Sequence, residues 1–449
     1  MRKTNSKVFQ NTVLVLGATF FTLAIFKCDA PESEADIDLS NESGQQQIST
    51  LTRAASVNRN KPTAAEWPQW RGPNRDGISL EKGWRKKWLD NPPKVLWRKP
   101  FGEGFSGISI ANEKAYTMFS EGSDEYAVCL DAVSGNELWR VKTGKVFSDW
   151  QGGDGPRSTP LIDSDLAYFL SGHGKLFALN AETGAEIWAS DFQKEFGASP
   201  PEWGFSGSPL IEGDALFIET GGNPGSALVA FDKNNGNVLW TSQTDKAGYS
   251  SPISAIVGDI HQIIFFTGTQ IFSVSPSNGT LFWMENWKTP YDVNAATPIF
   301  ISPDKLFISS GYDVGSALFQ MNRVNDEISV DEVWRSRELK NRMSTPIYYQ
   351  EHIYGFDTKF LRCVDARNGE TVWSGRGFGE GTLILSDGHL ITLSEKGKLA
   401  LIEASPESFN QIASVKLLKG KCWTVPTLAN GKIFARNESE IVCLDVSNN

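Results

Sequence analysis

The chain is poor in the residue types that most often hold metals or carry catalysis. Its 449 residues include four histidines and five cysteines, and no two cysteines are adjacent or arranged as C-x-x-C. The histidines (His173, His261, His352 and His389) are scattered singly, so a zinc or haem site has no support. The chain also lacks a P-loop, an H-E-x-x-H motif and a Ser-His-Asp arrangement. We therefore expect no metal and assign no catalytic residue.

Positive charge is also in deficit. The chain has 43 lysines and arginines against 53 aspartates and glutamates, which gives a formal net charge of −10. Binding to a phosphate backbone requires a basic surface stripe, so this balance argues against nucleic acid as a partner. The apolar run "VLVLGATFFTLAIF" at 13–26 is shorter than the roughly 20 residues of a membrane span.

The first 30 residues instead have the pattern of an export signal. A basic start precedes the apolar run, and Lys27 ends it. Cys28 is a lipidation candidate, although residues 25–27 depart from the small-residue pattern of a lipobox. Whether the segment at 1–30 is a signal peptide or a membrane anchor stays open. Residues 31–62 are polar, and we expect a disordered tether. The sequence thus predicts an exported periplasmic or cell-envelope protein that reaches a membrane only through its N-terminal segment.

Tryptophan and glycine are abundant, with 15 and 41 residues, and they recur in one hairpin pattern. The pattern is written "GKLFALNAETGAEIW", "YAVCLDAVSGNELW", "SALVAFDKNNGNVLW" and "FLRCVDARNGETVW". Its last residue recurs every 39 to 52 residues, at Trp97, Trp139, Trp188, Trp240, Trp283, Trp334 and Trp373, and Ile412 takes this place in one further unit. Each unit opens with a small-residue strand such as "STPLI" or "SSPIS". Four short strands in such a unit are the signature of one β-propeller blade.

Residues at fixed places in the hairpin predict how neighbouring blades pack. Glycine stands in the turn, at Gly135, Gly184, Gly236, Gly279 and Gly369, where a positive φ costs it little. A small residue stands ten places before the tryptophan, and we expect Ala178 to lie opposite Trp188. Cys129, Cys363 and Cys443 occupy this small position in three units. We therefore interpret these cysteines as buried space-fillers and not as bridges or metal ligands.

The two ends of the repeat predict how the ring closes. The last unit has three strands, and the strand around Trp97 has no hairpin before it. Pairing the two would complete a blade and remove both exposed sheet edges. We predict an all-β fold over residues 94–449: an eight-bladed β-propeller of four-stranded antiparallel blades, closed by an N-terminal strand that pairs with the C-terminal blade.

The hairpin resembles the tryptophan-docking repeat of the propellers related to pyrroloquinoline quinone (PQQ) enzymes. Together with "WPQWRGPNRDG" at 67–77, "WGFSGSP" and "KCWTVPTLANGKIF", it is similar to exported bacterial PQQ-binding-like β-propeller repeat proteins. More distantly, it resembles the outer-membrane assembly propeller lipoproteins and the PQQ-dependent alcohol dehydrogenases. The resemblance covers residues 66–449.

The resemblance implies two alternative functions, a binding module and a dehydrogenase. In the dehydrogenases a disulfide between adjacent cysteines clamps the quinone, and calcium lies beside it. This chain has no such cysteine pair, so PQQ with calcium is disfavoured. We expect a monomeric, non-catalytic binding or scaffold module for a protein or a small polar ligand. The alternative is a quinoprotein-like, PQQ-dependent dehydrogenase with an atypical site.

Long loops before several innermost strands suggest where a ligand would bind. Residues ahead of those strands should converge on the axis: Arg157, Trp203, Tyr249, Asn294, Arg342, Lys421 and Trp423, with Asp154, Asp292 and Glu380 nearby. In one interpretation, aromatic residues flank a planar or sugar-like ligand whose negative charge meets Arg157, Arg342 and Lys421. In the other, the arginines pair with the acids and the aromatic residues fill the narrow end.

The segment at 63–93 precedes the propeller, and we expect it to pack on the ring. Trp67 and Trp70 would form a plug under the propeller, held by ion pairs of Arg71, Arg75 and Asp76. The alternative places Arg75 and Asp76 at the mouth of the channel as ligand contacts.

Overall fold

The computed structural model describes residues 66–325 and 327–448. The chain divides into two compact units, 1–58 and 59–449, and the described residues belong to the second. The predicted signal or anchor (1–30), Cys28 and the tether (31–62) lie outside the described residues. Within the described part of the chain, no helix is long and apolar enough to cross a membrane.

The first four blades each consist of four consecutive antiparallel strands, ordered along the chain from the axis outward. Blade 1 holds β3 (Ser109–Ala111), β4 (Lys114–Glu121), β5 (Asp124–Asp131) and β6 (Glu137–Lys145). Blade 2 holds β7 (Leu161–Asp163), β8 (Leu166–Leu170), β9 (Lys175–Asn180) and β10 (Glu186–Asp191), followed by the short helix α1 (Phe192–Phe196). Blade 3 holds β11 (Leu210–Glu212), β12 (Ala215–Glu219), β13 (Leu228–Asp232) and β14 (Val238–Ser242). Blade 4 holds β15 (Ile253–Val257), β16 (Ile260–Phe266), β17 (Gln270–Val274) and β18 (Leu281–Asn286), followed by a 3-10 turn, η1 (Pro290–Asp292).

Blades 5 to 7 continue the pattern, and blade 8 combines the two ends of the repeat. Blade 5 holds β19 (Ile299–Ile301), β20 (Lys305–Ser310), β21 (Gly315–Val324) and β22 (Glu327–Ser336). Blade 6 holds β23 (Ile347–Tyr349), β24 (His352–Asp357), β25 (Phe360–Asp365) and β26 (Thr371–Gly375). Blade 7 holds β27 (Thr382–Ser386), β28 (His389–Leu393), β29 (Lys398–Glu403) and β30 (Gln411–Lys416), with β1 (Ile78–Ser79) added at its inner edge. Blade 8 holds β31 (Thr427–Ala429), β32 (Lys432–Arg436), β33 (Glu440–Asp445) and β2 (Lys94–Pro100).

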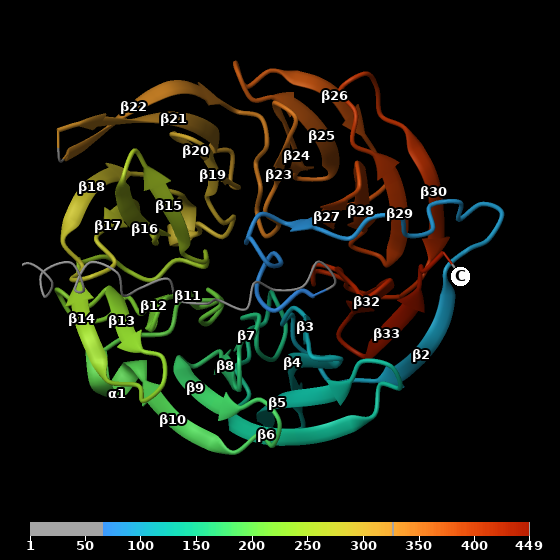
Figure 1. Ribbon diagram of the computed structural model, residues 1–449, viewed down its shortest axis with the longest axis horizontal. Helices are drawn as coiled ribbons and strands as arrows, with labels where there is room; N and C mark the ends of the chain where they lie inside the picture. Colours follow the sequence, from blue (N-terminus) through green and yellow to red (C-terminus); the bar gives the residue numbers. More distant parts are fainter. Residues whose placement is uncertain (1–65, 326, 449) are drawn as a thin grey trace, which may run out of the picture. The chain divides into compact units, whose positions relative to one another are not determined.

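The predicted ring closure is confirmed. Strand β2 pairs antiparallel with β33, so that Val95 lies opposite Leu444 and Trp97 opposite Cys443. Figure 1 shows the blades arranged around a common axis, with β2 beside the red C-terminal strands. The fold is therefore an all-β, eight-bladed propeller of four-stranded antiparallel blades.

The tryptophans dock each blade onto the next one, as the hairpin pattern predicts. Trp188 lies opposite Ala178 in its own blade. The indole of Trp139 packs on Gly184 of blade 2, where a Cβ atom would stand 2.9 Å from the ring. Trp139 Nε1 also donates to the carbonyl of Ala181 (3.1 Å) in that blade. The same indole-to-carbonyl bond recurs at Trp97, Trp188, Trp240, Trp334 and Trp373. Truncating a buried ring of this size to alanine costs about 3–5 kcal/mol.

Two blade boundaries depart from this pattern. Ala413, and not Ile412 as expected, takes the tryptophan's place in blade 7, because Ala413 pairs with Leu401 and Ile412 is the extra residue of a β-bulge. At the boundary between blades 4 and 5, Trp283 donates to Gln262 Oε1 within its own blade (2.9 Å). The hairpin of blade 5 is longer, with ten residues in each strand, and so lacks the short glycine turn on which an indole could pack.

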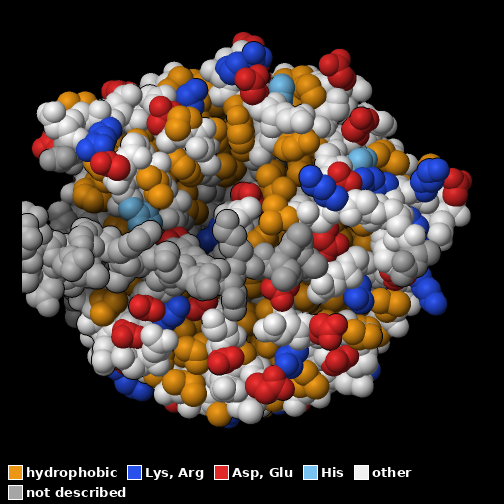
Figure 2. All heavy atoms as spheres, viewed as in Figure 1, with side chains coloured by type: hydrophobic (Ala, Val, Ile, Leu, Met, Phe, Trp, Pro, Cys, Tyr) orange, Lys and Arg blue, Asp and Glu red, His pale blue; other side chains and the backbone are white. Residues whose placement is uncertain are grey.

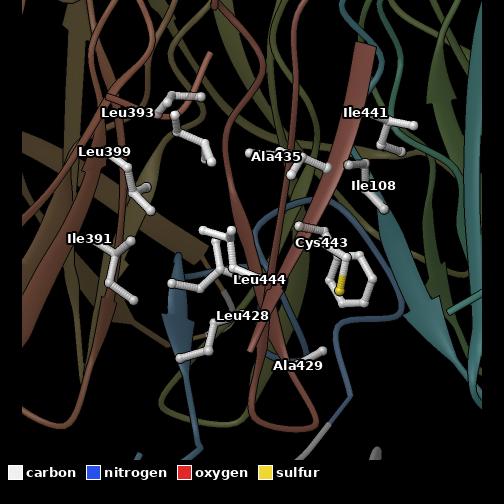
Figure 3. Close-up of a cluster of buried hydrophobic side chains, with 14 of the residues drawn as sticks. Ile108, Ile391, Leu393, Leu399, Leu428, Ala429, Ala435, Ile441, Cys443 and Leu444 are labelled. Atoms are coloured by element: carbon white, nitrogen blue, oxygen red, sulfur yellow. The ribbon is translucent and has the colours of Figure 1, made fainter. Parts of the chain in front are cut away.

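The cysteines at the small position are buried between the sheets. Cys129, Cys363 and Cys443 face their tryptophans in the register, and burial raises the pKa of each thiol to about 12. Figure 3 shows Cys443 and Leu444 pointing to opposite sides of β33, within a cluster that joins blades 7, 8 and 1. This alternation is the two-residue period of a strand that is buried on both faces.

The segment that precedes the ring crosses its axis. The backbone of Trp67 bonds with Ile110 of blade 1 (3.0 and 2.8 Å), and Trp70 Nε1 donates to Thr297 Oγ1 of blade 5 (2.9 Å). Strand β1 then runs parallel to β27 of blade 7. Figure 1 shows this blue segment crossing the centre of the ring before it reaches β2 at the rim. We call residues 67–79 the axial segment.

The arginines of the axial segment contact carbonyl groups and not acids. Arg71 donates to the carbonyls of Thr345 and Pro346 in blade 6 (3.3 and 2.9 Å). Arg75 donates to the carbonyls of Ser208 and Pro209 in blade 3 (3.2 and 2.8 Å). The expectation of ion pairs was therefore wrong in its partners: the two guanidinium groups bond carbonyl oxygens, and Asp76 accepts from the amide of Ile78. Burial lowers the pKa of Arg75 to about 9, which still leaves it charged at neutral pH.

Candidate functional site

A cavity of about 200 Å³ lies on the propeller axis, and every blade contributes to its wall. Most of its lining residues lie just ahead of or within the innermost strands, and Trp70, Arg71 and Gly77 of the axial segment also border it. The lining from the ring includes Phe105, Arg157, Trp203, Tyr249, Val293, Arg342, Leu383 and Trp423. The cavity thus exists because eight inner strands converge on one line.

Arg157 is one of the expected site residues that the structure places in this wall. Its guanidinium pairs with Asp149 (2.5 Å) and donates to the carbonyls of Gly153 (2.8 Å) and Gly155 (2.6 Å). It also stacks over the rings of Phe105 and Phe147. Burial is the main cause that lowers the pKa of Arg157. Because its donors are largely used within its own loop, Arg157 acts as part of the wall. Asp149 was not anticipated, since nothing in the sequence distinguishes it from other loop acids.

Arg342 lies on the wall with fewer partners. Its side chain is 44% exposed, and it donates to Glu380 Oε1 over a long 3.3 Å. Its guanidinium lies 5.5 Å from the centre of the Tyr312 ring. Burial lowers the pKa of Arg342, but the Tyr312 hydroxyl and Glu380 more than offset this, so the pKa is raised overall. Arg342 thus stays charged and keeps unused N–H groups.

Aromatic rings form most of the remaining wall and the mouth of the cavity. Trp203 packs against Tyr249 (centroids 5.8 Å apart) and Tyr291 (6.4 Å). Phe105 packs against Trp423 (5.3 Å). Lys421 Nζ stands 4.5 Å from the Trp423 ring and donates to the carbonyl of Gly152 (2.7 Å). The structure therefore places Trp203, Tyr249 and Trp423 in the cavity wall, whereas Lys421 contacts Trp423 without lining the cavity.

Five other candidates do not line the main cavity, and Lys421 is one of them. Asn294 is fully buried, and its amide donates to the carbonyls of Thr267, Gly268 and Trp287. Asp292 pairs with Lys246 (2.8 Å) outside the cavity. Asp154 is half-buried near Arg157. Glu380 borders only a small recess beside the cavity. Of the axial segment, Arg75 and Asp76 are likewise absent from the lining, so the alternative that placed them at the mouth was wrong.

Sequence reasoning missed a belt of side-chain hydroxyls that joins the innermost strands. The belt residues immediately precede the inner-strand prolines: Thr159, Ser208, Ser251, Thr297 and Thr345. The amide of Thr159 donates to Ser208 Oγ (2.9 Å), and the amide of Ser208 donates to Ser251 Oγ (2.9 Å). The amide of Thr297 likewise donates to Thr345 Oγ1 (3.0 Å). The signal was available, because the recurring Ser-Pro and Thr-Pro pairs place one hydroxyl per blade beside the axis. We call these five residues the hydroxyl belt.

The residues of this cavity do not fit PQQ with calcium. Among the residues that the structure describes, the cavity lining contains no aspartate, glutamate, histidine or cysteine. Calcium is held by oxygen ligands with several carboxylates among them, and none faces this space. Across the described residues, moreover, no three such side chains are grouped so that they could hold a metal ion. The wall instead offers arginines, hydroxyls and aromatic rings.

Charge on the exposed surface is mixed. Figure 2 shows acidic and basic side chains interspersed around the outer part of the face in view, with apolar side chains between them. No extended surface of one sign is visible on this face.

Together, the ring closure, the docking tryptophans and the axial cavity define a PQQ-like repeat propeller. Residues 123–375 match the family model described as outer membrane protein assembly factor BamB, and the chain belongs to this family.

The chain is also similar to individual proteins. It is 25% identical over 332 residues to outer membrane protein assembly factor BamB of Shewanella oneidensis, covering 68% of this chain and 76% of that protein. It is 26% identical over 166 residues to quinoprotein alcohol dehydrogenase PedH of Pseudomonas putida, covering 34% of this chain and 27% of that enzyme. The crystal structure of BamB from Moraxella catarrhalis superposes with a TM-score of 0.55 at 13% identity, covering 79% of this chain and 99% of that one. The structural likeness concerns the fold alone.

Proposed function

We propose that this chain is a non-catalytic propeller of the cell envelope that binds a protein partner through the mouth of its axial cavity. The observation that carries the proposal is the exposure of two large aromatic side chains there: Trp150 is 89% exposed and Tyr291 is 68% exposed. Tyr291 contacts Trp203, and Gln151, next to Trp150, lines the cavity. Tryptophan and tyrosine are enriched in protein interfaces and dominate their binding energy.

The backbone around Tyr291 supports this role. Tyr291 and Asp292 have φ angles of 66° and 56°, a conformation that residues other than glycine rarely adopt. Lys246 pairs with Asp292, and buried Asn294 anchors the chain just beyond it. The loop is thus fixed on both sides of an exposed ring. Strained, well-anchored loop residues are typical of recognition sites.

The family supports the location and the type of partner. Several relatives are named as outer membrane protein assembly factors, so a cell-envelope position and a protein partner are the natural expectation for this chain. The signal or anchor at 1–30, lipidation at Cys28, the tether at 31–62 and action as a monomer belong to the same proposal. The PQQ-dependent dehydrogenase alternative lacks support from the site, because the cavity offers neither carboxylates for calcium nor cysteines for a clamp.

Site-specific photo-crosslinking in cells of the source organism tests this function. A photoreactive phenylalanine analogue would replace Trp150 or Tyr291 in turn, and Val372 would serve as the matched control. Val372 is 44% exposed but lies on β26, the outer strand of blade 6. We expect positions 150 and 291 to yield an adduct with the same envelope protein, and position 372 to yield none. Absence of adducts at both mouth positions, or the same adduct from position 372, would contradict the proposal.

A further inference from the structure

The hydroxyl belt, whose five residues come from blades 2 to 6, is interrupted on the side of the cavity formed by blades 7 and 8. In blade 8 the residue before the inner-strand proline is Val425, which has no hydroxyl, and blade 7 has no proline at this place. Val425 borders the cavity together with its neighbours Trp423 and Thr424. The belt therefore cannot continue across blade 8, and polar groups on this side must find other partners.

Two polar groups beside this interruption have no partner among the described residues. The Trp423 indole nitrogen and the Thr424 hydroxyl are both buried and make no hydrogen bond. Thr424 as a whole is only 3% exposed. Leaving a buried donor unpaired is costly, so each such group points to a ligand or an ordered water. Both residues line the axial cavity.

A cation completes this side of the wall. Arg342 and Trp423 border both the main cavity and the adjoining recess, so they lie on the same side. Glu380 takes one N–H of the guanidinium at 3.3 Å, which leaves further donors for a second acceptor. A ligand here must therefore present an acceptor to Arg342.

The remainder of the wall limits the shape of such a ligand. Trp203, Tyr249 and Phe105 offer flat apolar surfaces. A space of about 200 Å³ compares with the roughly 10–15 Å³ that one water requires by the same measure. The cavity therefore admits a ring with several substituents.

From these features we infer that the axial cavity binds an acidic sugar, a pyranose ring that carries a carboxylate. The carboxylate accepts from Arg342, as charge-assisted bonds to a guanidinium are the strongest available. Ring hydroxyls pair with Trp423 Nε1 and Thr424 Oγ1, and the C–H face of the sugar packs on the aromatic wall. A flat aromatic acid would satisfy Arg342 but would leave the Trp423 indole nitrogen and the Thr424 hydroxyl without partners. This site is independent of the protein partner proposed above.

Calorimetric titration of the full chain at low salt tests the inference. The probes are D-glucuronate and D-glucose, which differ only in the carboxylate, with benzoate as a flat acid without hydroxyls. We expect glucuronate to bind at least about tenfold more tightly than glucose, the factor of one charged hydrogen bond. A disaccharide that ends in glucuronate separates two sources: tighter binding than the monosaccharide indicates a polysaccharide end, and loss of binding indicates a free sugar acid.

Variants locate the site. Arg342→Gln should abolish the preference for glucuronate over glucose, whereas Trp423→Phe, which keeps an aromatic ring but removes the N–H, should weaken both sugars by about threefold. Arg335→Gln is the matched control, because Arg335 lies on outer strand β22 and pairs with Glu332; it should change nothing. If Trp423→Phe lowers the melting temperature, Thr424→Val replaces it. The inference is overturned if no sugar binds, if glucose and glucuronate bind equally, if benzoate binds more tightly than glucuronate, or if Arg342→Gln keeps the preference.

Discussion

Five of the docking tryptophans pack on a single glycine in the next blade, as Trp139 does on Gly184. The sequence predicts the glycines from turn geometry alone, and their positive φ angles agree, as at Gly184 (φ 75°). The sequence could not show that the indole of the neighbouring blade occupies the space that a side chain at this glycine would need. That contact crosses a blade boundary, and a local pattern carries no information about which surface faces it. Gly184 is thus required both by the positive φ of its turn and by the indole that packs on it.

Substituting Gly184 separates those two constraints. In Gly184→Ala the new Cβ meets Trp139 at 2.9 Å and the backbone keeps its positive φ. We expect a loss of about 2–4 kcal/mol in the free energy of unfolding, from overpacking and backbone strain together. Gly213→Ala is the control, because Gly213 has φ 61° but nothing within 4 Å of the added atom; it should lose only about 1 kcal/mol. Equal losses in urea denaturation would show that the indole contact contributes nothing.

Among the larger elements, the hairpins were predictable and the axial segment was predictable only in part. Hairpins follow from alternation, turn residues and the small residue opposite each tryptophan, all of which are local. The axial segment makes its bonds with inner strands far along the chain, such as Arg75 with Pro209 and Arg71 with Pro346. From sequence alone, an acidic residue is the expected partner of an arginine. Here backbone carbonyls accept the hydrogen bonds instead, and the sequence does not show which backbone carbonyl will lie near an arginine. For the same reason only some of the predicted site residues line the cavity. Arg157 does so, whereas the amide of Asn294 donates to backbone carbonyls and holds its own loop in place.

The axial segment should therefore fasten the ring through buried bonds. In Arg75→Met the carbonyls of Ser208 and Pro209 would lose their donor while remaining buried, and we expect a loss of about 2–4 kcal/mol in the free energy of unfolding. Arg140→Met is the control, because Arg140 forms ion pairs with Glu121 and Glu137 at the surface. Pairs of that kind contribute about 0–1 kcal/mol. Denaturation midpoints compare the two variants, and a loss for Arg75→Met no larger than the control's would show that the segment only rests on the ring.

For the molecule as a whole, the decisive feature is the seam in blade 8. Since β2 belongs to the beginning of the repeat and β33 to its end, their pairing supplies the fourth strand of blade 8 and closes the linear array into a ring. Only a closed ring brings eight inner strands to one axis and so creates the cavity, the hydroxyl belt and the mouth. The sequence predicts this from the missing fourth strand of the last unit. The sequence could not predict which side chains line the cavity, because this depends on which loop residues point toward the axis.

A disulfide across the seam tests this account most directly. Lys99 and Ile441 are register partners in β2 and β33, and paired strands bring Cα atoms within the distance that a disulfide allows. The double variant Lys99→Cys/Ile441→Cys should form the bond on mild oxidation, seen as a linked peptide in mass spectrometry, and should raise the melting temperature. Lys99→Cys/Val372→Cys, which pairs β2 with an outer strand of blade 6, should form none. Failure of the registered pair to link, or linking of the control pair, would contradict the closed eight-bladed ring.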